Sequence, residues 1–221
     1  MNKTIHQTWK TLAIDWEKVP FSQEWRDSWM DMNPGWKYKM WDDEGLRNFV
    51  RIEFPKFLPV YDSYPSQIFR VDAARYLVLK RQGGVFADLD MACLKPLDQL
   101  AGYLDHAVFG KQWDGPTIEN GIVCNALMAS PPEHPLWDRI VGSLNVRSGI
   151  RQVLGATGPN FLTDYILNYQ GTDVRIFDPT TFHPVRWNAP EKADLLSLPL
   201  SEIQSRYPHS FTISHWAGSW K

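Results

Sequence analysis

Apolar residues recur at helical spacing in several stretches of the chain, and the strongest amphipathic pattern covers residues 66–82. A step of about 100° per residue places four aliphatic side chains on one side of this helix and three basic side chains on the other. The aliphatic side consists of Ile68, Val71, Val78 and Leu79, and the basic side of Arg70, Lys80 and Arg81. Gly83 and Gly84 follow, and glycine readily adopts the left-handed backbone that ends a helix.

The other periodic segments predict strands that alternate with helices. Strands are predicted at residues 4–9, 36–41, 85–87, 107–110, 122–128, 174–177 and 211–214. Further helices are predicted from Ser22, from Asp42, at 135–146 and at 159–169. This alternation is typical of the α/β class with a mostly parallel central sheet.

Two short polar motifs lie at the boundaries of these elements. The acidic run Asp42-Asp43-Glu44 is expected to cap the helix that follows, because negative charge is favourable at a helix N-terminus. Metal binding by this run is the less favoured alternative. Asn120-Gly121 predicts a hairpin turn before the strand at 122–128.

Composition narrows the class of protein. The chain has 221 residues, of which 43% are hydrophobic and 22% charged, and this fits one folded domain with a substantial core. Lys and Arg number 23 and Asp and Glu 25, so the net charge of −2 gives no general attraction for nucleic acid. We therefore expect no nucleic-acid partner. Most of the 11 Trp are expected in the core, and a few are candidates for stacking on ligands.

The sequence also bears on the compartment. The first residues lack the apolar segment of a signal peptide, and no apolar run approaches the roughly 18 residues that a membrane span needs. Cys93 and Cys124 each lie in an apolar stretch and are expected to be buried free thiols, which suits a reducing compartment. We expect a cytoplasmic protein, with peripheral association at the inner face of the membrane as an alternative.

Two charged residues lie on the apolar side of the helix at 66–82. Arg75 projects into the aliphatic stripe, and Asp72 lies at its edge one turn away. Charges on a buried helix face are costly unless they are paired. Two interpretations follow: a purely structural ion pair, or a pair that lines a polar pocket at the edge of the core.

The motif Gly83-Gly84-Val85-Phe86-Ala87-Asp88-Leu89-Asp90 ends a predicted strand with two acidic residues. Side chains two apart in an extended segment point the same way, so the carboxylates of Asp88 and Asp90 are expected on one side. A hard divalent cation relieves their repulsion, and a diphosphate can complete its coordination. An Asp-x-Asp alone is a weak signal, but its position after a helix that carries Asp72 and Arg75 makes it a predicted metal and diphosphate site.

Four motifs in a fixed order give the chain a family resemblance. They are Ile5-His6-Gln7-Thr8-Trp9-Lys10, Asn33-Pro34-Gly35-Trp36 with Trp41-Asp42-Asp43, Arg70-Val71-Asp72-Ala73-Ala74-Arg75-Tyr76, and the glycine-to-aspartate motif at 83–90. Over roughly residues 3–100 they resemble the Asp-x-Asp sugar-binding glycosyltransferases of family 32. That family includes fungal initiating α-1,6-mannosyltransferases and bacterial capsule or lipopolysaccharide enzymes, and clostridial glucosylating toxins share its core more distantly.

The resemblance implies a GT-A fold, that is, a single Rossmann-like α/β domain over residues 1–221. Residues of about 1–110 would form the nucleotide-sugar-binding half, and residues of about 111–210 the acceptor half. We expect residues 211–221 to form a C-terminal lid that orders when nucleotide and metal bind together.

The resemblance also implies roles for single residues. Trp9 would stack on the base of the donor, and Asp72 and Arg75 would contact its ribose or sugar. Asp90 would bind the metal directly, and Asp88 would reach the metal through water or hold the sugar.

Residues outside these motifs are less informative. Asn125 lies in the apolar run 122–128, where a polar side chain needs a partner, and it resembles the family's Asn that faces the donor sugar. Relatives often have Tyr where this chain has Phe86, so a hydroxyl contact from that position is absent here. Five histidines are expected to be structural or surface residues: His6, His106, His134, His183 and His209.

The segment His215-Trp216-Ala217-Gly218-Ser219-Trp220 supplies a candidate third metal ligand. It resembles the terminal segments of related retaining transferases, with one residue fewer before the last Trp. The imidazole of His215 would complete an Mn²⁺ shell with Asp88 and Asp90, because nitrogen ligands suit Mn²⁺ better than Mg²⁺. Ser219 would add an oxygen and Trp220 would cover the diphosphate.

Together these features favour a metal-dependent retaining glycosyltransferase with Asp72, Arg75, Asp88 and Asn125 as catalytic residues. With Mn²⁺ or Mg²⁺, it would move a hexose from a nucleotide-diphosphate sugar, UDP-hexose ahead of GDP-mannose, to a glycan or lipid-linked glycan acceptor. One alternative is a non-catalytic nucleotide-sugar or carbohydrate-binding module. Another is a nucleotidyltransferase or phosphohydrolase, which no Walker motif or His-Asp hydrolase pair supports.

Overall fold

A six-stranded sheet in the order β2-β1-β3-β6-β5-β7 runs through the middle of the molecule. The computed structural model describes residues 2–103, 105–113, 121–147, 149–195 and 197–218. Only β6 is antiparallel to its neighbours, β3 and β5; the pairings β1–β2, β1–β3 and β5–β7 are parallel. The six strands are β1 (Thr4–Thr8), β2 (Lys37–Trp41), β3 (Gly84–Ala87), β5 (Ala107–Lys111), β6 (Val123–Ser130) and β7 (Val174–Phe177). The predicted α/β class with a mostly parallel sheet is therefore confirmed.

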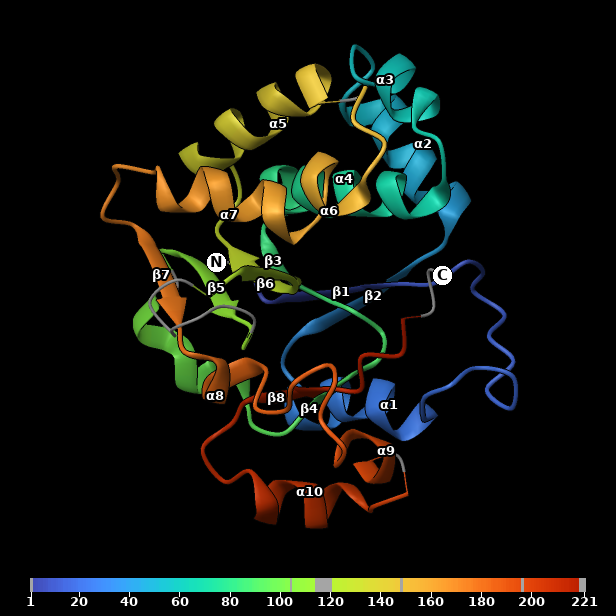
Figure 1. Cartoon of the computed structure of the whole chain (residues 1–221), viewed down its shortest axis with the longest axis vertical. Helices are drawn as coiled ribbons and strands as arrows, with labels where there is room; N and C mark the ends of the chain where they lie inside the picture. Colours follow the sequence, from blue (N-terminus) through green and yellow to red (C-terminus); the bar gives the residue numbers. More distant parts are fainter. Residues whose placement is uncertain (1, 104, 114–120, 148, 196, 219–221) are drawn as a thin grey trace.

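Helices cover both faces of this sheet, which makes a three-layer arrangement (Figure 1). One face carries α2 (Asp43–Glu53), α3 (Leu58–Ser63), α4 (Gln67–Gln82), α5 (Pro135–Arg147), α6 (Val153–Ala156) and α7 (Pro159–Leu167). The other face carries α1 (Gln23–Met32), the 3-10 helix η1 (Leu97–Tyr103), α8 (Pro179–Phe182), α9 (Lys192–Leu195) and α10 (Leu200–Arg206). No helix within the described ranges is both long and apolar enough to cross a bilayer.

The helix α4 is buried more completely than its sequence pattern predicts. All residues from 72 to 79 are buried, whereas Ile68 and Val71 of the expected aliphatic stripe stay partly exposed. The predicted basic side, Arg70, Lys80 and Arg81, does keep part of its exposure, but the middle of the helix is buried all round because α4 packs on the sheet and also against α2 and α5. The site residues Asp72 and Arg75 thus lie inside the protein.

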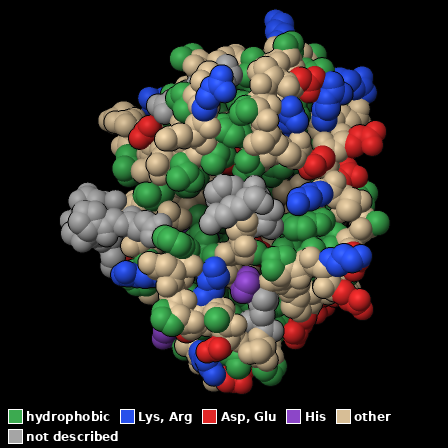
Figure 2. Space-filling model, turned by 45° about the vertical axis from the view of Figure 1, so that its right-hand side comes forward, with side chains coloured by type: hydrophobic (Ala, Val, Ile, Leu, Met, Phe, Trp, Pro, Cys, Tyr) green, Lys and Arg blue, Asp and Glu red, His purple; other side chains and the backbone are tan. Residues whose placement is uncertain are grey.

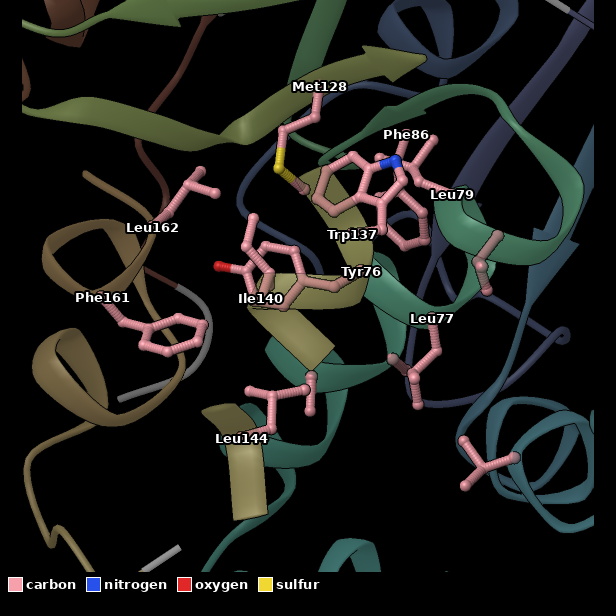
Figure 3. Close-up of a cluster of buried hydrophobic side chains, with 14 of the residues drawn as sticks. Tyr76, Leu77, Leu79, Phe86, Met128, Trp137, Ile140, Leu144, Phe161 and Leu162 are labelled. Carbon is pink, nitrogen blue, oxygen red and sulfur yellow. The ribbon is translucent and has the colours of Figure 1, made fainter. Parts of the chain in front are cut away.

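The main core fills the space between α4, α5, α7 and the sheet. Figure 3 shows how side chains from these elements interdigitate. Trp137 of α5 packs beside Tyr76 of α4, with ring centroids 6.0 Å apart, and its Nε1 donates to Ser130 Oγ at 2.8 Å. This packing holds α4 in one position over the carboxyl end of β3.

Two glycines make the turn from α4 into β3 compact. Gly83 has φ 63° and Gly84 has φ 93°, in the left-handed region that favours glycine. A Cβ on Gly84 would lie 2.3 Å from the carbonyl oxygen of Thr4, so a side chain there would push β3 away from β1. The predicted role of Gly83 and Gly84 in turning the chain from helix to strand is confirmed.

Other predicted boundaries are confirmed to within one or two residues. Asp42 accepts a hydrogen bond from Gly45 N at 2.7 Å, so the acidic run caps α2 as expected. Asn120 lies outside the described residues, but β5 and β6 do pair as antiparallel neighbours. Both cysteines are buried and free.

The sequence pattern missed a second, two-stranded sheet. The strand β4 (Met91–Cys93) directly follows the Asp-x-Asp motif and pairs antiparallel with β8 (Thr212–Ser214). The predicted strand at 211–214 therefore exists, but it lies outside the central sheet. This pairing brings the C-terminal segment next to the acidic motif.

Candidate active site

The acidic motif lies at the carboxyl end of β3. The Asp88 N–H donates to Ala126 O at 2.8 Å, which continues the pairing with β6. The carbonyl of Asp88 then accepts from Met91 N at 3.2 Å and closes a tight turn over residues 88–91. The Asp88 side chain remains about one-third exposed, at 34%. Asp88 is thus fixed in its backbone while its carboxylate is open to a ligand.

Arg75 connects the acidic motif to α4. Its Nη1 lies 2.9 Å from Asp88 Oδ1, its Nη2 lies 3.3 Å from Asp72 Oδ1, and Nη1 also donates to Asn125 O at 2.5 Å. Burial would lower the pKa of Arg75, but the charges of Asp88 and Asp72 outweigh burial and hold that pKa above its usual value. The Asp72–Arg75 ion pair exists, and it extends to Asp88 at the surface.

The carboxylate of Asp72 is almost entirely enclosed, with 5% of the residue exposed. Asn125 Nδ2 donates to Asp72 Oδ1 at 3.0 Å, and Thr157 Oγ1 lies 3.5 Å from Oδ2. Burial raises the pKa of Asp72 to about 7, against the opposing effect of Arg75. The sequence predicted that Asn125 needs a partner, and Asp72 is that partner. Thr157 was missed, because a Thr before Gly-Pro at a helix start reads as ordinary loop sequence.

Asp90 is held by the C-terminal segment. Its carbonyl accepts from His215 N at 2.9 Å, and its Oδ2 accepts from Ala217 N at 2.7 Å. Trp216 lies between these donors with φ 57°, an unusual backbone for a non-glycine residue that turns both N–H groups toward Asp90. Burial, and next the charge of Asp88, raise the pKa of Asp90 to about 6. Sequence reasoning could not find the Ala217 contact, because it involves only the backbone.

His215 stands beside this carboxylate with its side chain partly enclosed. The imidazole packs edge-on against Trp25 at 5.9 Å between ring centroids. Its Nδ1 is buried and accepts or donates no hydrogen bond within the described chain. Burial, and then the charge of Lys192, lower the pKa of His215, which favours the neutral imidazole that a metal ion binds.

The described residues present no ready-made group of three His, Cys, Asp or Glu side chains for a metal ion. The chemistry of the local residues nevertheless fits a divalent cation. Asp88 and Asp90 both have raised pKa values, mainly through burial, so a cation would stabilise their ionised forms. The unpartnered nitrogen of His215 could supply a further ligand. The set Asp88, Asp90 and His215 therefore stays a prediction.

The remaining predicted ligand-binding residues lie at the ends of the chain. Trp9 directly follows β1, is partly buried, and packs edge-on against Phe21 with ring centroids 5.2 Å apart. A hollow of about 560 Å³ opens beside the loop after Trp9. Its lining residues are Leu12, Ala13, Ile14, Trp16, Arg26 and Met40. Ser219 and Trp220 lie outside the described residues, and their predicted roles are untested.

Charged side chains are mixed on the face drawn in Figure 2. Lys and Arg side chains alternate there with Asp and Glu side chains, and neither sign forms a broad patch. This agrees with the net charge of −2.

Comparisons with known proteins agree with this geometry. Residues 22–105 match the family described as "Glycosyltransferase sugar-binding region containing DXD motif". The match includes Asp72, Arg75, Asp88 and Asp90. The chain belongs to this glycosyltransferase family. The family predicted from the four motifs is therefore confirmed.

Curated relatives of this glycosyltransferase extend the similarity beyond the matched region. Inositol phosphoceramide mannosyltransferase 3 of Schizosaccharomyces pombe is 37% identical over 166 residues, covering 73% of this chain and 43% of that protein. Mannosyl phosphorylinositol ceramide synthase SUR1 of Saccharomyces cerevisiae is 34% identical over 193 residues, covering 81% and 47%. The chain thus spans less than half the length of these two relatives.

The fold is also shared with solved structures. The ligand-free glycosyltransferase domain from the YGT toxin superposes with a TM-score of 0.52 at 8% identity, covering 79% of this chain and 80% of that chain. At such low identity the likeness concerns the fold alone. The predicted GT-A fold is confirmed, whereas the division into two halves at about residue 110 stays a prediction. That division would cut β5 (Ala107–Lys111), so both halves share one sheet.

Proposed function

We propose that this glycosyltransferase moves a hexose from a nucleotide-diphosphate sugar to a hydroxyl acceptor, with the help of a divalent cation and with retention of anomeric configuration. The observation that carries the proposal is the charge network at the end of β3, where Arg75 links Asp72 to Asp88. Asp90 lies two residues beyond. Carboxylates held beside a fixed guanidinium group suit a ligand that has many hydroxyl groups and a diphosphate.

The residues divide the work between sugar and diphosphate. Asp72 is the most enclosed of the three carboxylates and, with Asn125, offers acceptor and donor groups to sugar or ribose hydroxyls. Arg75 fixes the carboxylates of Asp72 and Asp88, so that neither needs to reorganise when the donor binds. A divalent cation held by Asp90, with Asp88 and His215 nearby, would neutralise the negative charge of the leaving diphosphate.

Mannose is the first sugar to test. One relative described above is named an inositol phosphoceramide mannosyltransferase, and the other a mannosyl phosphorylinositol ceramide synthase. These names favour GDP-mannose over the UDP-hexoses that the sequence alone favoured. They also favour an acceptor whose hydroxyl belongs to a glycolipid head group or glycan. Retention would follow if the acceptor hydroxyl attacks on the face from which the diphosphate leaves.

A donor-hydrolysis screen tests the proposal. Purified protein with Mn²⁺ is offered GDP-mannose, UDP-glucose, UDP-galactose and UDP-N-acetylhexosamines, and release of nucleotide diphosphate is measured. We expect turnover of one donor and its loss in Asp88→Asn. The matched control is Asp98→Asn, which removes an exposed carboxylate paired with Lys3 and should keep wild-type turnover. The anomeric configuration of the transferred sugar, read by NMR, tests retention.

A non-catalytic binding module is the competing function. Such a module would bind a nucleotide sugar without releasing nucleotide diphosphate. Tight donor binding by calorimetry, combined with no turnover of any donor in the presence of glycolipid and glycan acceptors, would favour this alternative.

A further inference from the structure

The polar side chain of Gln7 is buried on an apolar face of the central sheet. Gln7 is fully enclosed, with 0% exposed, and lies on the same side of β1 as Ile5, which packs in the apolar layer under α1. Burying an amide in such a layer is unfavourable unless its hydrogen bonds are made. The side-chain amide of Gln7 therefore needs hydrogen-bond partners inside the protein.

Gln7 links a residue of β2 to the residue that directly follows β3. Its Nε2 donates to the carbonyl oxygen of Asp88 at 3.0 Å, and its Oε1 accepts from the hydroxyl of Tyr38 at 2.8 Å. The orientation of the amide is chemically determined, because a carbonyl oxygen can only accept and must face the NH₂ group. Burial raises the pKa of Tyr38 well above its usual value, so its hydroxyl keeps the proton that it donates.

The carbonyl that Gln7 contacts is the first of the turn over residues 88–91. The same oxygen accepts from Met91 N at 3.2 Å, and the last carbonyl of the turn, that of Met91, accepts from Trp29 Nε1 at 2.8 Å. Two buried side chains thus fix the two ends of the turn. This turn therefore fixes the directions in which the side chains of Asp88 and Asp90 leave the backbone.

We propose that Gln7 is a positioning residue: through the carbonyl of Asp88 it sets the relative orientation of the Asp88 and Asp90 carboxylates. Arg75 holds Asp88 from the side chain, and Gln7 holds it from the backbone on the other face of the sheet. Tyr38 supports Gln7 by fixing its amide. The expected effect on catalysis rests on the proposed function. The expected effect on the turn over residues 88–91 does not depend on it.

The variant Gln7→Met tests this role, because it keeps most of the side-chain volume and removes both hydrogen bonds. We expect kcat for donor hydrolysis per folded molecule to fall about tenfold or more, or the half-saturating Mn²⁺ concentration to rise by a similar factor, as for other groups that orient metal ligands. We also expect faster amide hydrogen exchange at Leu89, Asp90 and Met91.

The matched control is Ser130→Ala. Ser130 is equally buried and accepts from Trp137 Nε1, but it lies opposite Gly84 at the far end of β3. Its loss should lower stability without changing kcat, Mn²⁺ dependence or exchange in the turn beyond the global change. If Gln7→Met behaves like this control in all three measurements, the proposal is overturned.

Two further measurements separate failure of the Gln7 proposal from failure of the proposed function and from misfolding of the variant. If wild-type protein turns over no donor, the proposed function fails, and exchange at residues 89–91 alone decides whether Gln7 fixes the turn. If Gln7→Met does not fold, Tyr38→Phe takes its place, since it removes only the hydroxyl that fixes the amide. It should change the same measurements in the same direction by a smaller factor, and unchanged exchange in the turn would overturn the proposal.

Discussion

Arg75 Nη1 lies 2.9 Å from Asp88 Oδ1, so a guanidinium that is almost wholly buried in α4 neutralises the first carboxylate of the acidic motif. The same guanidinium also lies 3.3 Å from Asp72. One cation thereby serves two anions that belong to different elements. The packing of α4 and the shape of the site depend on the same side chain.

The first prediction concerns Arg75→Met, which keeps most of the volume and removes the charge. It leaves Asp72 buried without its cation, and we expect a loss of about 3–5 kcal/mol in the free energy of unfolding, as is typical of a broken buried pair. Urea denaturation measures this loss. Donor turnover per folded molecule should also disappear. Wild-type turnover by the folded variant would remove the Arg75–Asp88 contact from the site.

A surface variant provides the comparison for this experiment. Arg47→Met breaks an exposed ion pair with Asp62, and its unfolding midpoint should change little, because exposed pairs contribute little to stability.

The second prediction concerns metal removal. Stripping the protein with a chelator should stop donor hydrolysis, and Mn²⁺ should restore it better than Mg²⁺ if the nitrogen of His215 is a ligand. Activity is followed as release of nucleotide diphosphate against added metal. In Asp90→Asn the half-saturating metal concentration should rise by about tenfold or more. Full activity of metal-stripped protein in excess chelator would contradict the metal-dependent mechanism.

The third prediction concerns pH. Burial raises the pKa of Asp90 from 3.8 to about 6, so between about pH 4 and pH 6 the folded chain holds its proton more tightly than the unfolded chain. The free energy of unfolding should therefore fall as pH rises through this window. Burial raises the pKa of Asp72 to about 7, so the decline should continue to about pH 7 and level off above it. Denaturation midpoints at half-unit pH intervals measure the slope, which should be shallower in Asp90→Asn. Because Mn²⁺ binds the ionised carboxylate, its addition at pH 7 should raise the midpoint. An Asp90→Asn slope equal to that of the wild type would refute the assignment.

The fourth prediction separates the side chain of His215 from its backbone. His215→Ala removes the imidazole but keeps the N–H that binds Asp90 O, so it should weaken mainly the preference for Mn²⁺ over Mg²⁺. Deleting residues 215–221 also removes the Ala217 N–H that binds Asp90 Oδ2, and should weaken nucleotide diphosphate binding further. Calorimetric titration of nucleotide diphosphate with each metal distinguishes the two. Equal binding by the deletion variant and the wild type would exclude the segment as a lid.

Much of the fold could be predicted because periodicity reports local preference. The strands at the start of the chain, the helix before the acidic motif and its glycine stop all follow from residue spacing and turn chemistry. The pattern failed where tertiary packing decided the outcome. Residues 72–79 are buried on all sides of α4, because α2 and α5 pack against it in addition to the sheet, whereas the basic residues near its two ends keep part of their exposure.

The sequence likewise predicts several side chains of the candidate site but not all of the contacts that complete it. Asp72, Arg75 and Asn125 were noticed because charged and polar residues in apolar surroundings need partners, and the structure supplies those partners to one another. The Ala217 contact is different, because a backbone N–H carries no sequence signal. Thr157 was missed because its position beside Asp72 depends on how α6 packs on α4 and α7 packs beside α6.

The ladder between β4 and β8 has a consequence for how the protein reaches its working form. Residues 91–93 pair with residues 212–214, about 120 positions later in the chain, and this pairing brings the Ala217 N–H close to Asp90. Contacts between distant segments form late in folding, because closing a long loop costs conformational entropy. During synthesis the acidic motif leaves the ribosome long before its last partner, so an incomplete chain has the sugar-binding region but not the finished surroundings of Asp90. We therefore expect donor turnover only once the C-terminal segment has folded onto the acidic motif.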